Sequence, residues 1–167
     1  MKVYVGIDNG TTGTIGVVGK GYTDFIETPR MRRRDFQKSR EKYLYRLDWE
    51  LFHIKIQAHI DRCKGSLAVV IERPFSNAKC WDASIAALRC WESQLQVLER
   101  LGVFEPILCS SGPWQKELLP GVKGEESLKL ASKVLGLELF PEHAEIINKH
   151  KDADGILIAE WARRNSL

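Results

Sequence analysis

The sequence of 167 residues has the length of one domain with a sizeable buried core, so we predict a single domain over residues 1–167. Its hydrophobic fraction of 44% is ordinary for a globular protein, and a net charge of +3 does not by itself indicate a polyanionic partner. Because no apolar run is long enough to span a bilayer and no signal peptide precedes the first predicted strand, we expect a cytoplasmic protein without membrane contacts.

The four cysteines are widely spaced and form no C-x-x-C pair; they are Cys63, Cys80, Cys90 and Cys109. Pairs at that spacing are typical of zinc sites, so a zinc site is not expected. Scattered cysteines indicate reduced thiols rather than a disulfide framework.

Three short strands are predicted to open the chain as an antiparallel meander. Val3 to Ile7 alternates with the period of a strand, and Asn9-Gly10 and Gly13 break the run before Thr14 to Val18 resumes it. Tyr22 to Thr28 reads as the third strand. Asp8 closes the first strand, where strand propensity disfavours an acid. Because Asn9-Gly10 already supplies the turn, the sequence favours a cation-binding role for Asp8.

Helices alternate with apolar strands after a basic stretch from Pro29 to Tyr43. Asp48 is a suitable N-cap for a helix from Trp49 to about Cys63, which Gly65 ends. Leu67 to Glu72 is a nearly all-apolar run, typical of a strand buried on both faces.

Further helices and one more buried strand are predicted beyond residue 80. Ser84 is a candidate cap for a helix with an apolar stripe from Ile85 to Leu98, which Gly102 ends. The remaining elements are a strand at Val103–Cys109 bent at Pro106, a loop at Ser110–Lys116, a helix at Glu125–Leu135 stopped by Gly136, a short helical piece at Pro141–Ile147 and a last helix from about Asp152 to Arg164. This order predicts an α/β domain with a mixed five-stranded sheet, in which an antiparallel three-strand meander joins two parallel strands and helices flank the sheet.

Acidic side chains from three segments are expected to meet at one end of this sheet. Val3 precedes Asp8 by the same number of residues as Leu67 precedes Glu72, so parallel pairing of these strands, ~4.8 Å apart, brings the two carboxylates together. Asp152 and Asp154 open the last helix. Carboxylates without nearby cysteines suit a hard cation such as Mg²⁺, and two such ions ~3.5–4 Å apart serve in-line displacement at a phosphodiester.

Each acid alone is equally consistent with a structural role, and Asp152 in particular has the position of a helix N-cap. The set is more specific than its members, because three separate segments each offer an acid at a plausible sheet end. The residues by themselves indicate a metal-dependent nuclease fold and no particular substrate.

Three motifs resemble those of the RuvC family of Holliday-junction resolvases, especially its phage-type members, within the RNase H-like superfamily. They are Gly6-Ile-Asp8-Asn-Gly-Thr-Thr-Gly13 at the first strand, Val70-Ile-Glu72-Arg-Pro-Phe75 at the second acid and Asp154-Gly-Ile-Leu-Ile-Ala159 in the terminal helix. The resemblance covers nearly the whole chain. It implies an RNase H-like fold with catalytic, metal-binding acids at Asp8, Glu72 and Asp154, and we add Asp152 to this predicted site.

One departure from the family concerns the fourth ligand. The family usually has Asp or His about one helical turn before the terminal acid, whereas this chain has Lys151 three residues before Asp154 and His150 four before it. Residues four apart share a helix face, and residues two apart point nearly opposite ways. His150 could therefore serve if the helix already runs there, and Asp152 only if the backbone is not yet helical.

The resemblance also implies a mode of action. It implies a homodimer that binds four-way DNA junctions and nicks two strands symmetrically, with two Mg²⁺ per active site, for which Mn²⁺ substitutes. The implied location is the bacterial cytoplasm, or that of the host if a phage encodes the protein. An aromatic shortly after the second acid inserts at the branch point in the family, and Phe75 matches it; without the family, a core aromatic would be the favoured interpretation.

Basic side chains are the candidates for DNA contacts. Between Arg30 and Lys42 there are seven Lys or Arg and two acids. A solvated loop is one interpretation of such a run, and a DNA-binding arm is the other, because clustered acids need compensating charge to receive a polyanion. The predicted DNA-binding residues are Arg32, Arg33, Arg34, Lys38, Arg73, Phe75, Lys79, Lys116 and Lys123.

Three alternatives remain beside the resolvase. An RNase H acting on RNA–DNA hybrids would share the fold. A junction-binding protein without catalysis would follow if Lys151 marks a lost ligand. The stretch from Gly6 to Gly13 also resembles the first phosphate loop of sugar kinases and actin-like ATPases, although the chain lacks the length for their second lobe.

Overall fold

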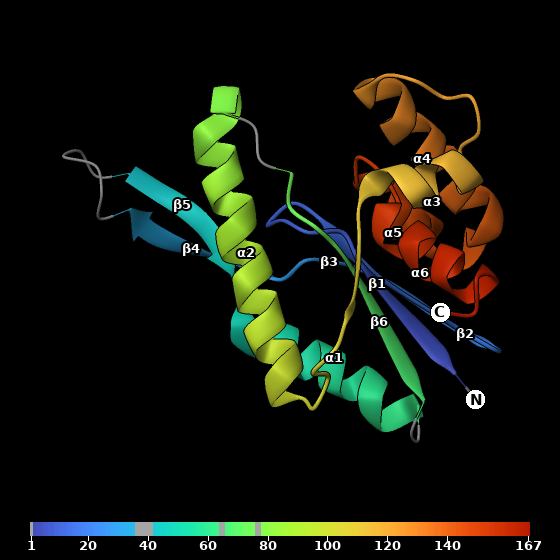
Figure 1. Ribbon diagram of the computed structural model, residues 1–167, viewed down its shortest axis with the longest axis horizontal. Coiled ribbons are helices and arrows are strands. Elements are labelled where there is room, and N and C mark those ends of the chain that lie inside the picture. Colours follow the sequence, from blue (N-terminus) through green and yellow to red (C-terminus); the bar gives the residue numbers. More distant parts are fainter. Residues whose placement is uncertain (1, 36–41, 64–65, 76–77) are drawn as a thin grey trace.

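A mixed five-stranded sheet forms the centre of the molecule in a computed structural model, which describes residues 2–35, 42–63, 66–75 and 78–167 (Figure 1). Its strand order is β3-β2-β1-β6-β7. The strands are β1 (Val3–Ile7), β2 (Thr14–Gly19), β3 (Tyr22–Glu27), β6 (Leu67–Glu72) and β7 (Ile107–Cys109). β1, β2 and β3 pair antiparallel, whereas β1, β6 and β7 run parallel. The predicted arrangement of meander and parallel strands is confirmed.

The register of β1 and β6 is the one that the sequence predicted. Val3 pairs with Leu67, and Ile7 pairs with Ile71. Asp8 and Glu72 therefore leave the same edge of the sheet on adjacent strands.

Helices cover both faces of the sheet (Figure 1). They are α1 (Trp49–Cys63), α2 (Trp81–Arg100), α3 (Ser111–Leu118), α4 (Glu125–Leu139), α5 (Ala144–Lys149) and α6 (Asp154–Arg164). Alternate residues of β1 point to opposite faces, so Val5 packs with α1 and α2 in one apolar cluster while Tyr4 packs with α3 to α6 in the other. Within the described ranges, no helix is long and apolar enough to cross a membrane.

Helix α6 lies directly on β1 and β2 because glycines occupy the contact. A Cβ atom on Gly6 would lie 2.3 Å from the carbonyl oxygen of Gly155, and one on Gly16 would lie 2.1 Å from Cα of Ile156. No real side chain tolerates such distances, so the helix and the sheet touch through their main chains. This contact fixes the start of α6, and with it Asp154, at the edge of the sheet where β1 ends.

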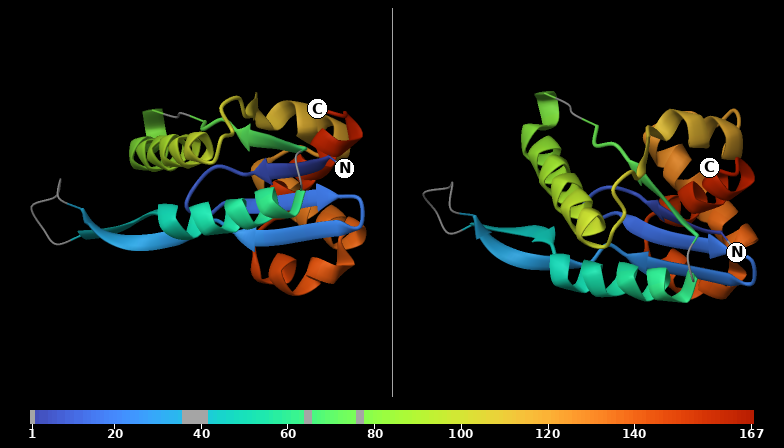
Figure 2. Two further views of the ribbon diagram at one scale, coloured as in Figure 1. Left: turned by 90° about the horizontal axis from the view of Figure 1, so that it is seen from below. Right: turned by 60° about the horizontal axis from the view of Figure 1, so that its bottom comes forward.

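The basic stretch is a β-hairpin where the structure describes it, and its interpretation as a solvated loop is wrong there. β4 (Arg30–Asp35) pairs antiparallel with β5 (Lys42–Leu47), and the hairpin extends beyond the sheet (Figures 1 and 2). The guanidinium of Arg30 lies 4.6 Å from the ring centroid of Tyr45, and that of Arg32 lies 4.2 Å from that of Tyr43. These stacked pairs stabilise a ribbon that has few apolar contacts.

Two local predictions fail at helix starts. Ser84 lies buried inside α2, which begins at Trp81, so Ser84 is not its cap. The predicted loop after Cys109 is helix α3, in which Pro113 lies in the first turn. Proline is tolerated there because the first helical N–H groups have no partner within the helix.

Two predicted ends also differ from the structure. Helix α4 continues past Gly136 to Leu139, because Gly136 is a packing residue: its missing Cβ would lie 2.4 Å from Cβ of Ala153. Strand β7 begins only after Pro106, which has no N–H to donate to a neighbouring strand.

Two further local predictions are confirmed. Asp48 caps α1 through a 3.1 Å hydrogen bond from the Leu51 N–H, and Gly102 follows α2 with a positive φ of 82°. The predicted stop at Gly65 lies outside the described residues. All four cysteines are free thiols, as predicted.

Candidate metal centre

Three carboxylates from distant parts of the chain converge beside the end of β1. Oxygen atoms of Asp8, Asp152 and Asp154 all lie within 4.8 Å of one another. Asp8 follows β1, Asp154 is the first residue of α6, and Asp152 lies in the link that precedes α6. Glu72 stands outside this triplet, at the end of the adjacent strand, where its charge acts on Asp8 and Asp154.

The turn between β1 and β2 holds Asp8 in place. The Asp8 N–H donates to the carbonyl oxygen of Thr14 at 2.9 Å. Gly13 passes so close that a Cβ on it would lie 2.2 Å from the Asp8 carbonyl oxygen and 3.0 Å from its Oδ2. Because Gly13 has no side chain, there is room beside it for the Asp8 carboxylate.

Two buried hydroxyl groups position Asp154. Ser132 on α4 donates to Asp154 Oδ1 and accepts the Ala153 N–H at 3.1 Å. Thr14 on β2 accepts the Gly155 N–H at 3.0 Å. The first turn of α6 is thus tied to a neighbouring helix on one side and to the sheet on the other.

Asp152 lies before the helix begins, which is the condition under which the sequence allows it to be a metal ligand. Residues 150–153 are not helical and α6 begins at Asp154, so Asp152 is free of the helical geometry that would turn it away. The N-cap position belongs to Ala153, and the interpretation of Asp152 as an N-cap is therefore wrong.

His150 stands behind Asp152. Its Nδ1 lies 3.1 Å from the Asp152 carbonyl oxygen and 3.3 Å from Oδ1, and its Nε2 lies 3.2 Å from the carbonyl oxygen of Thr12. Carbonyl oxygens only accept, so both bonds form together when the imidazole is protonated. The contact with Asp152 raises the pKa of His150 accordingly.

Glu72 is held by a tryptophan from α3. Trp114 is fully buried, and its Nε1 donates to Glu72 Oε2 at 2.9 Å. Burial raises the pKa of Glu72, and this hydrogen bond opposes the rise by stabilising the charged form.

Burial, followed by the repulsion between crowded carboxylates, dominates the electrostatics of the site. Burial raises the pKa of Asp8 well above its usual range, and repulsion from Asp154, Asp152 and Glu72 adds to the effect. Burial and the charge of Asp152 raise the pKa of Asp154 to about 7. Burial would also raise the pKa of Asp152, but the neighbouring His150 and Lys151 hold it below its usual value. Without a cation, the cluster does not ionise fully at neutral pH.

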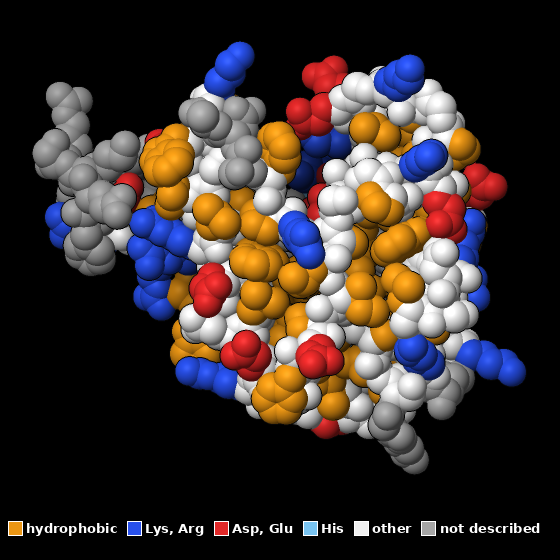
Figure 3. Space-filling model, viewed as in Figure 1, with side chains coloured by type: hydrophobic (Ala, Val, Ile, Leu, Met, Phe, Trp, Pro, Cys, Tyr) orange, Lys and Arg blue, Asp and Glu red, His pale blue; other side chains and the backbone are white. Residues whose placement is uncertain are grey.

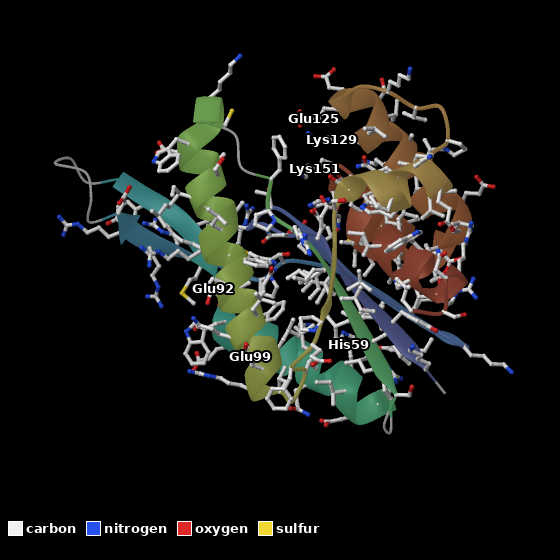
Figure 4. The ribbon with its side chains drawn as sticks, in the orientation of Figure 1. His59, Glu92, Glu99, Glu125, Lys129 and Lys151 are labelled. Carbon is white, nitrogen blue, oxygen red and sulfur yellow. The ribbon has the colours of Figure 1, made fainter. Side chains whose placement is uncertain are left out.

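The donor atoms fit a hard divalent cation. Asp152 is 1% exposed, and among the described residues its Oδ1 makes an ion-pair contact of 3.3 Å with His150 Nδ1 but no hydrogen bond. A buried carboxylate oxygen without a partner is costly unless a cation or a proton meets it. Lys151 offers a partial substitute, since its Nζ lies 3.5 Å from the other oxygen of Asp152. Figure 4 shows Lys151 near Lys129 and Glu125, which form an ion pair at the rim.

The predicted DNA-binding residues lie on exposed surfaces where the structure describes them. Phe75 is 82% exposed three residues after Glu72, so its interpretation as a core aromatic is wrong. Lys38 lies outside the described residues. The others are exposed, namely Arg32, Arg33 and Arg34 on β4, Arg73 after β6, Lys79 in the turn before α2, Lys116 on α3 and Lys123 before α4.

The groups that orient the acids could not be identified from the sequence. Ser132 and Thr14 contact the start of α6 from elements far away in the chain, and no spacing rule links them to Asp154. Likewise, no spacing rule links Trp114 to Glu72, the acid that it contacts.

Comparison with known proteins gives a structural likeness alone. No protein-family model matches the sequence, and no curated protein matches it either. The chain is similar to Thermus thermophilus RuvC in complex with a Holliday junction substrate, with 17% identity, a TM-score of 0.57 and coverage of 99% of this chain and 95% of that one. A second Thermus thermophilus RuvC structure gives 19% identity, a TM-score of 0.49 and coverage of 98% and 96%. The RuvC-like fold that the motifs predicted is therefore confirmed, and the chain has the RNase H-like fold of RuvC.

Proposed function

We propose that the protein is a metal-dependent endonuclease that resolves four-way DNA junctions by nicking two strands symmetrically as a homodimer. The observation that carries this proposal is the convergence of Asp8, Asp152 and Asp154 at the edge of the sheet, with Glu72 beside them. The structural neighbour in complex with a Holliday junction supports the choice of a branched substrate.

The acids would hold one or two Mg²⁺ ions, with Mn²⁺ as a substitute. Bound there, the ions would supply a Lewis acid that activates water and stabilises the leaving oxygen. Asp8 and Asp152 provide oxygens from the turn and the link, and Asp154 provides one from the start of α6. Trp114 and Ser132 hold Glu72 and Asp154 in fixed orientations, so the site needs little rearrangement before it binds cations.

The exposed basic residues would carry the DNA backbone across the site. The hairpin presents arginines on β4, and Lys116 on α3 and Lys123 before α4 present further exposed cations. Phosphate contacts of this kind give affinity that falls steeply with salt and does not depend on sequence. Phe75 is placed to stack on an unpaired base at the branch point, because it follows Glu72 closely and is exposed.

The outer face of α2 is the candidate surface for a second copy of the chain. One side of α2 packs on the sheet through Cys90, Val97 and Leu98. Its outer side lines a groove of about 780 Å³ against β5, and Trp81 at its start is 66% exposed. Figure 3 shows hydrophobic side chains gathered over α2. An apolar surface of this kind, with charged residues of both signs around it, suits self-association.

Cleavage assays with matched substrates test the proposal. Wild-type protein is incubated with a four-way junction, a linear duplex of the same sequence and an RNA–DNA hybrid, each with Mg²⁺, Mn²⁺ or EDTA. We expect paired, symmetric nicks in the junction with either ion and no cleavage in EDTA. Preferred hydrolysis of the hybrid would instead establish the RNase H alternative, and tight junction binding without nicks in any metal would establish the binding protein. ATP hydrolysis without nuclease activity would establish the phosphotransferase.

Replacement of Phe75 by alanine should lower junction cleavage without lowering stability. A base stacked on an aromatic ring is worth ~1–3 kcal/mol, so we expect a loss of about 5- to 150-fold in single-turnover cleavage. Phe104→Ala is the matched control, because Phe104 is 74% exposed after α2 and belongs to no part of the site. Equal losses in the two variants, or a large drop in melting temperature for Phe75→Ala, would contradict the proposed role.

A further inference from the structure

A second, basic hollow adjoins the acid cluster and contains none of the four predicted acids, although His150 lines it. It has a volume of about 250 Å³. Its walls come from three places: the turn at residues 11–13, the connection from β3 to β4 with Thr28 and Arg30, and residues 149–151 between α5 and α6. These segments are distant in sequence, so the hollow is a product of the fold.

Cations dominate the walls of the hollow. Arg30, Lys149 and Lys151 line it, and Glu27 is the acid on its wall. Arg30 lies over the ring of Tyr45, with its guanidinium carbon 4.6 Å from the ring centroid, and such a contact does not use the N–H donors that a phosphate needs. Lys149 pairs with Glu145 across one turn of α5, and both side chains are largely exposed. Exposed pairs of this type are worth little, so a phosphate can take the place of the carboxylate.

Hydroxyl groups complete the lining. Thr11, Thr12 and Thr28 surround the hollow. Thr28 is 3% exposed, and among the described residues its hydroxyl has no hydrogen-bond partner. Threonine hydroxyls and main-chain N–H groups beside arginine and lysine are the usual partners of phosphate oxygens, whereas an apolar ligand would find few contacts here.

The hollow is continuous with the acid cluster through His150 and Lys151. His150 contacts Asp152 with Nδ1 and the carbonyl oxygen of Thr12, in the wall of the hollow, with Nε2. Lys151 lies on the wall of the hollow, and its Nζ is 3.5 Å from Asp152 Oδ2. A strand whose phosphate lies at the acids therefore has a site of opposite charge next to it for a neighbouring phosphate.

We propose that this hollow binds a second backbone phosphate of the same DNA strand, adjacent to the phosphate at the acid cluster. The ligand is a phosphodiester group. That this group comes from a DNA strand rests on the proposed nuclease function. Holding two successive phosphates fixes the direction in which the strand crosses the acids. It thereby selects which phosphodiester bond is cut.

The test compares two arginines that both stack on tyrosine. Arg30→Gln removes one of the three Lys or Arg charges at the hollow. Arg62→Gln removes a charge from α1 that lies over the ring of Tyr22 on β3 and does not line the hollow. Lys149→Gln is a second variant on an exposed helix position, where folding is not at risk. Binding of a fluorescent four-way junction is measured in EDTA over a series of salt concentrations. We expect Arg30→Gln and Lys149→Gln each to lower the slope of log K against log salt by ~0.9 or less, and Arg62→Gln to leave it unchanged.

Chemically modified junctions and free phosphate identify the source of the ligand. Replacing the phosphate next to the cut bond by a neutral methylphosphonate should weaken binding by the wild type and leave Arg30→Gln unaffected. Equal salt slopes for Arg30→Gln and Arg62→Gln would overturn the proposal. The proposal would also be overturned by a combination of two results: inorganic phosphate raises the melting temperature of the wild type but not of Arg30→Gln, and the modified junction binds the wild type as tightly as the unmodified one. Arg30-dependent junction binding without any cleavage would keep the phosphate site and reject the nuclease.

Discussion

Asp8→Asn should reduce junction cleavage by more than about a hundredfold in Mg²⁺ while the protein still binds the junction. Loss of groups that merely orient metal ligands typically costs ~10–100-fold in metal affinity or activity, so loss of a ligand should cost more. Asparagine retains the size and one acceptor oxygen of Asp8 but removes its charge from the cluster of three carboxylates. Affinity for the junction should be kept or improved, because one negative charge beside the DNA is gone.

The measurement is single-turnover cleavage together with binding in Ca²⁺. Asp61→Asn is the matched control, since Asp61 is an exposed acid on α1 that accepts a hydrogen bond from the side chain of Gln57 and is not part of the acid cluster. Cleavage by Asp8→Asn at the wild-type rate would remove the proposed metal centre from the mechanism.

Asp154→Asn should stabilise the metal-free protein although it abolishes cleavage. The pKa of Asp154 is about 7 in the folded protein and ~3.9 in an unfolded chain. Because the folded state holds the proton of Asp154 more tightly than the unfolded state, this group costs no stability below pH ~4. As the pH rises from there to about 7, the free energy of unfolding falls. The separation of the two pKa values corresponds to a cost on the order of 4 kcal/mol at pH 8, which the neutral amide does not incur.

Urea unfolding in EDTA between pH 4 and 8 checks this expectation. The wild type should lose stability across that range, and the curves of variant and wild type should meet near pH 4. Mg²⁺ should stabilise the wild type strongly at pH 8 and Asp154→Asn much less, because stabilisation of the folded state by a bound cation increases with its affinity. A variant that is less stable than the wild type at pH 8 in EDTA would contradict the electrostatic account of the site.

The sheet could be predicted from the sequence because its signals are local. The apolar runs of β1 and β6 have clear ends, and counting from Val3 and Leu67 gives the register that the structure has. Hairpin β4–β5 was missed because arginines on β4 read as a charged loop, although Tyr43 and Tyr45 alternate with Leu44 in the manner of a strand. Helix α3 was missed because its Gly-Pro sequence is also common in loops.

The acidic residues of the candidate site could be predicted from the sequence, whereas the residues that orient them could not. Asp8 and Glu72 follow from strand ends, and their closeness follows from the pairing of β1 with β6. Whether Asp152 or His150 lies nearer Asp8 depends on where α6 begins, and helix boundaries shift by one or two residues without a strong sequence signal. The contact of Ser132 with Asp154 depends on how α4 packs against the link before α6, which is a tertiary feature.

The glycine contact between α6 and the sheet has a consequence for how this protein tolerates change. Since Gly6, Gly16 and Gly155 bring the two backbones into direct touch, the separation of Asp8 from Asp154 does not depend on the volumes of neighbouring apolar residues. Mutational tolerance should therefore be very narrow at these three glycines, where even alanine would push the helix away from the sheet and move Asp154 relative to Asp8.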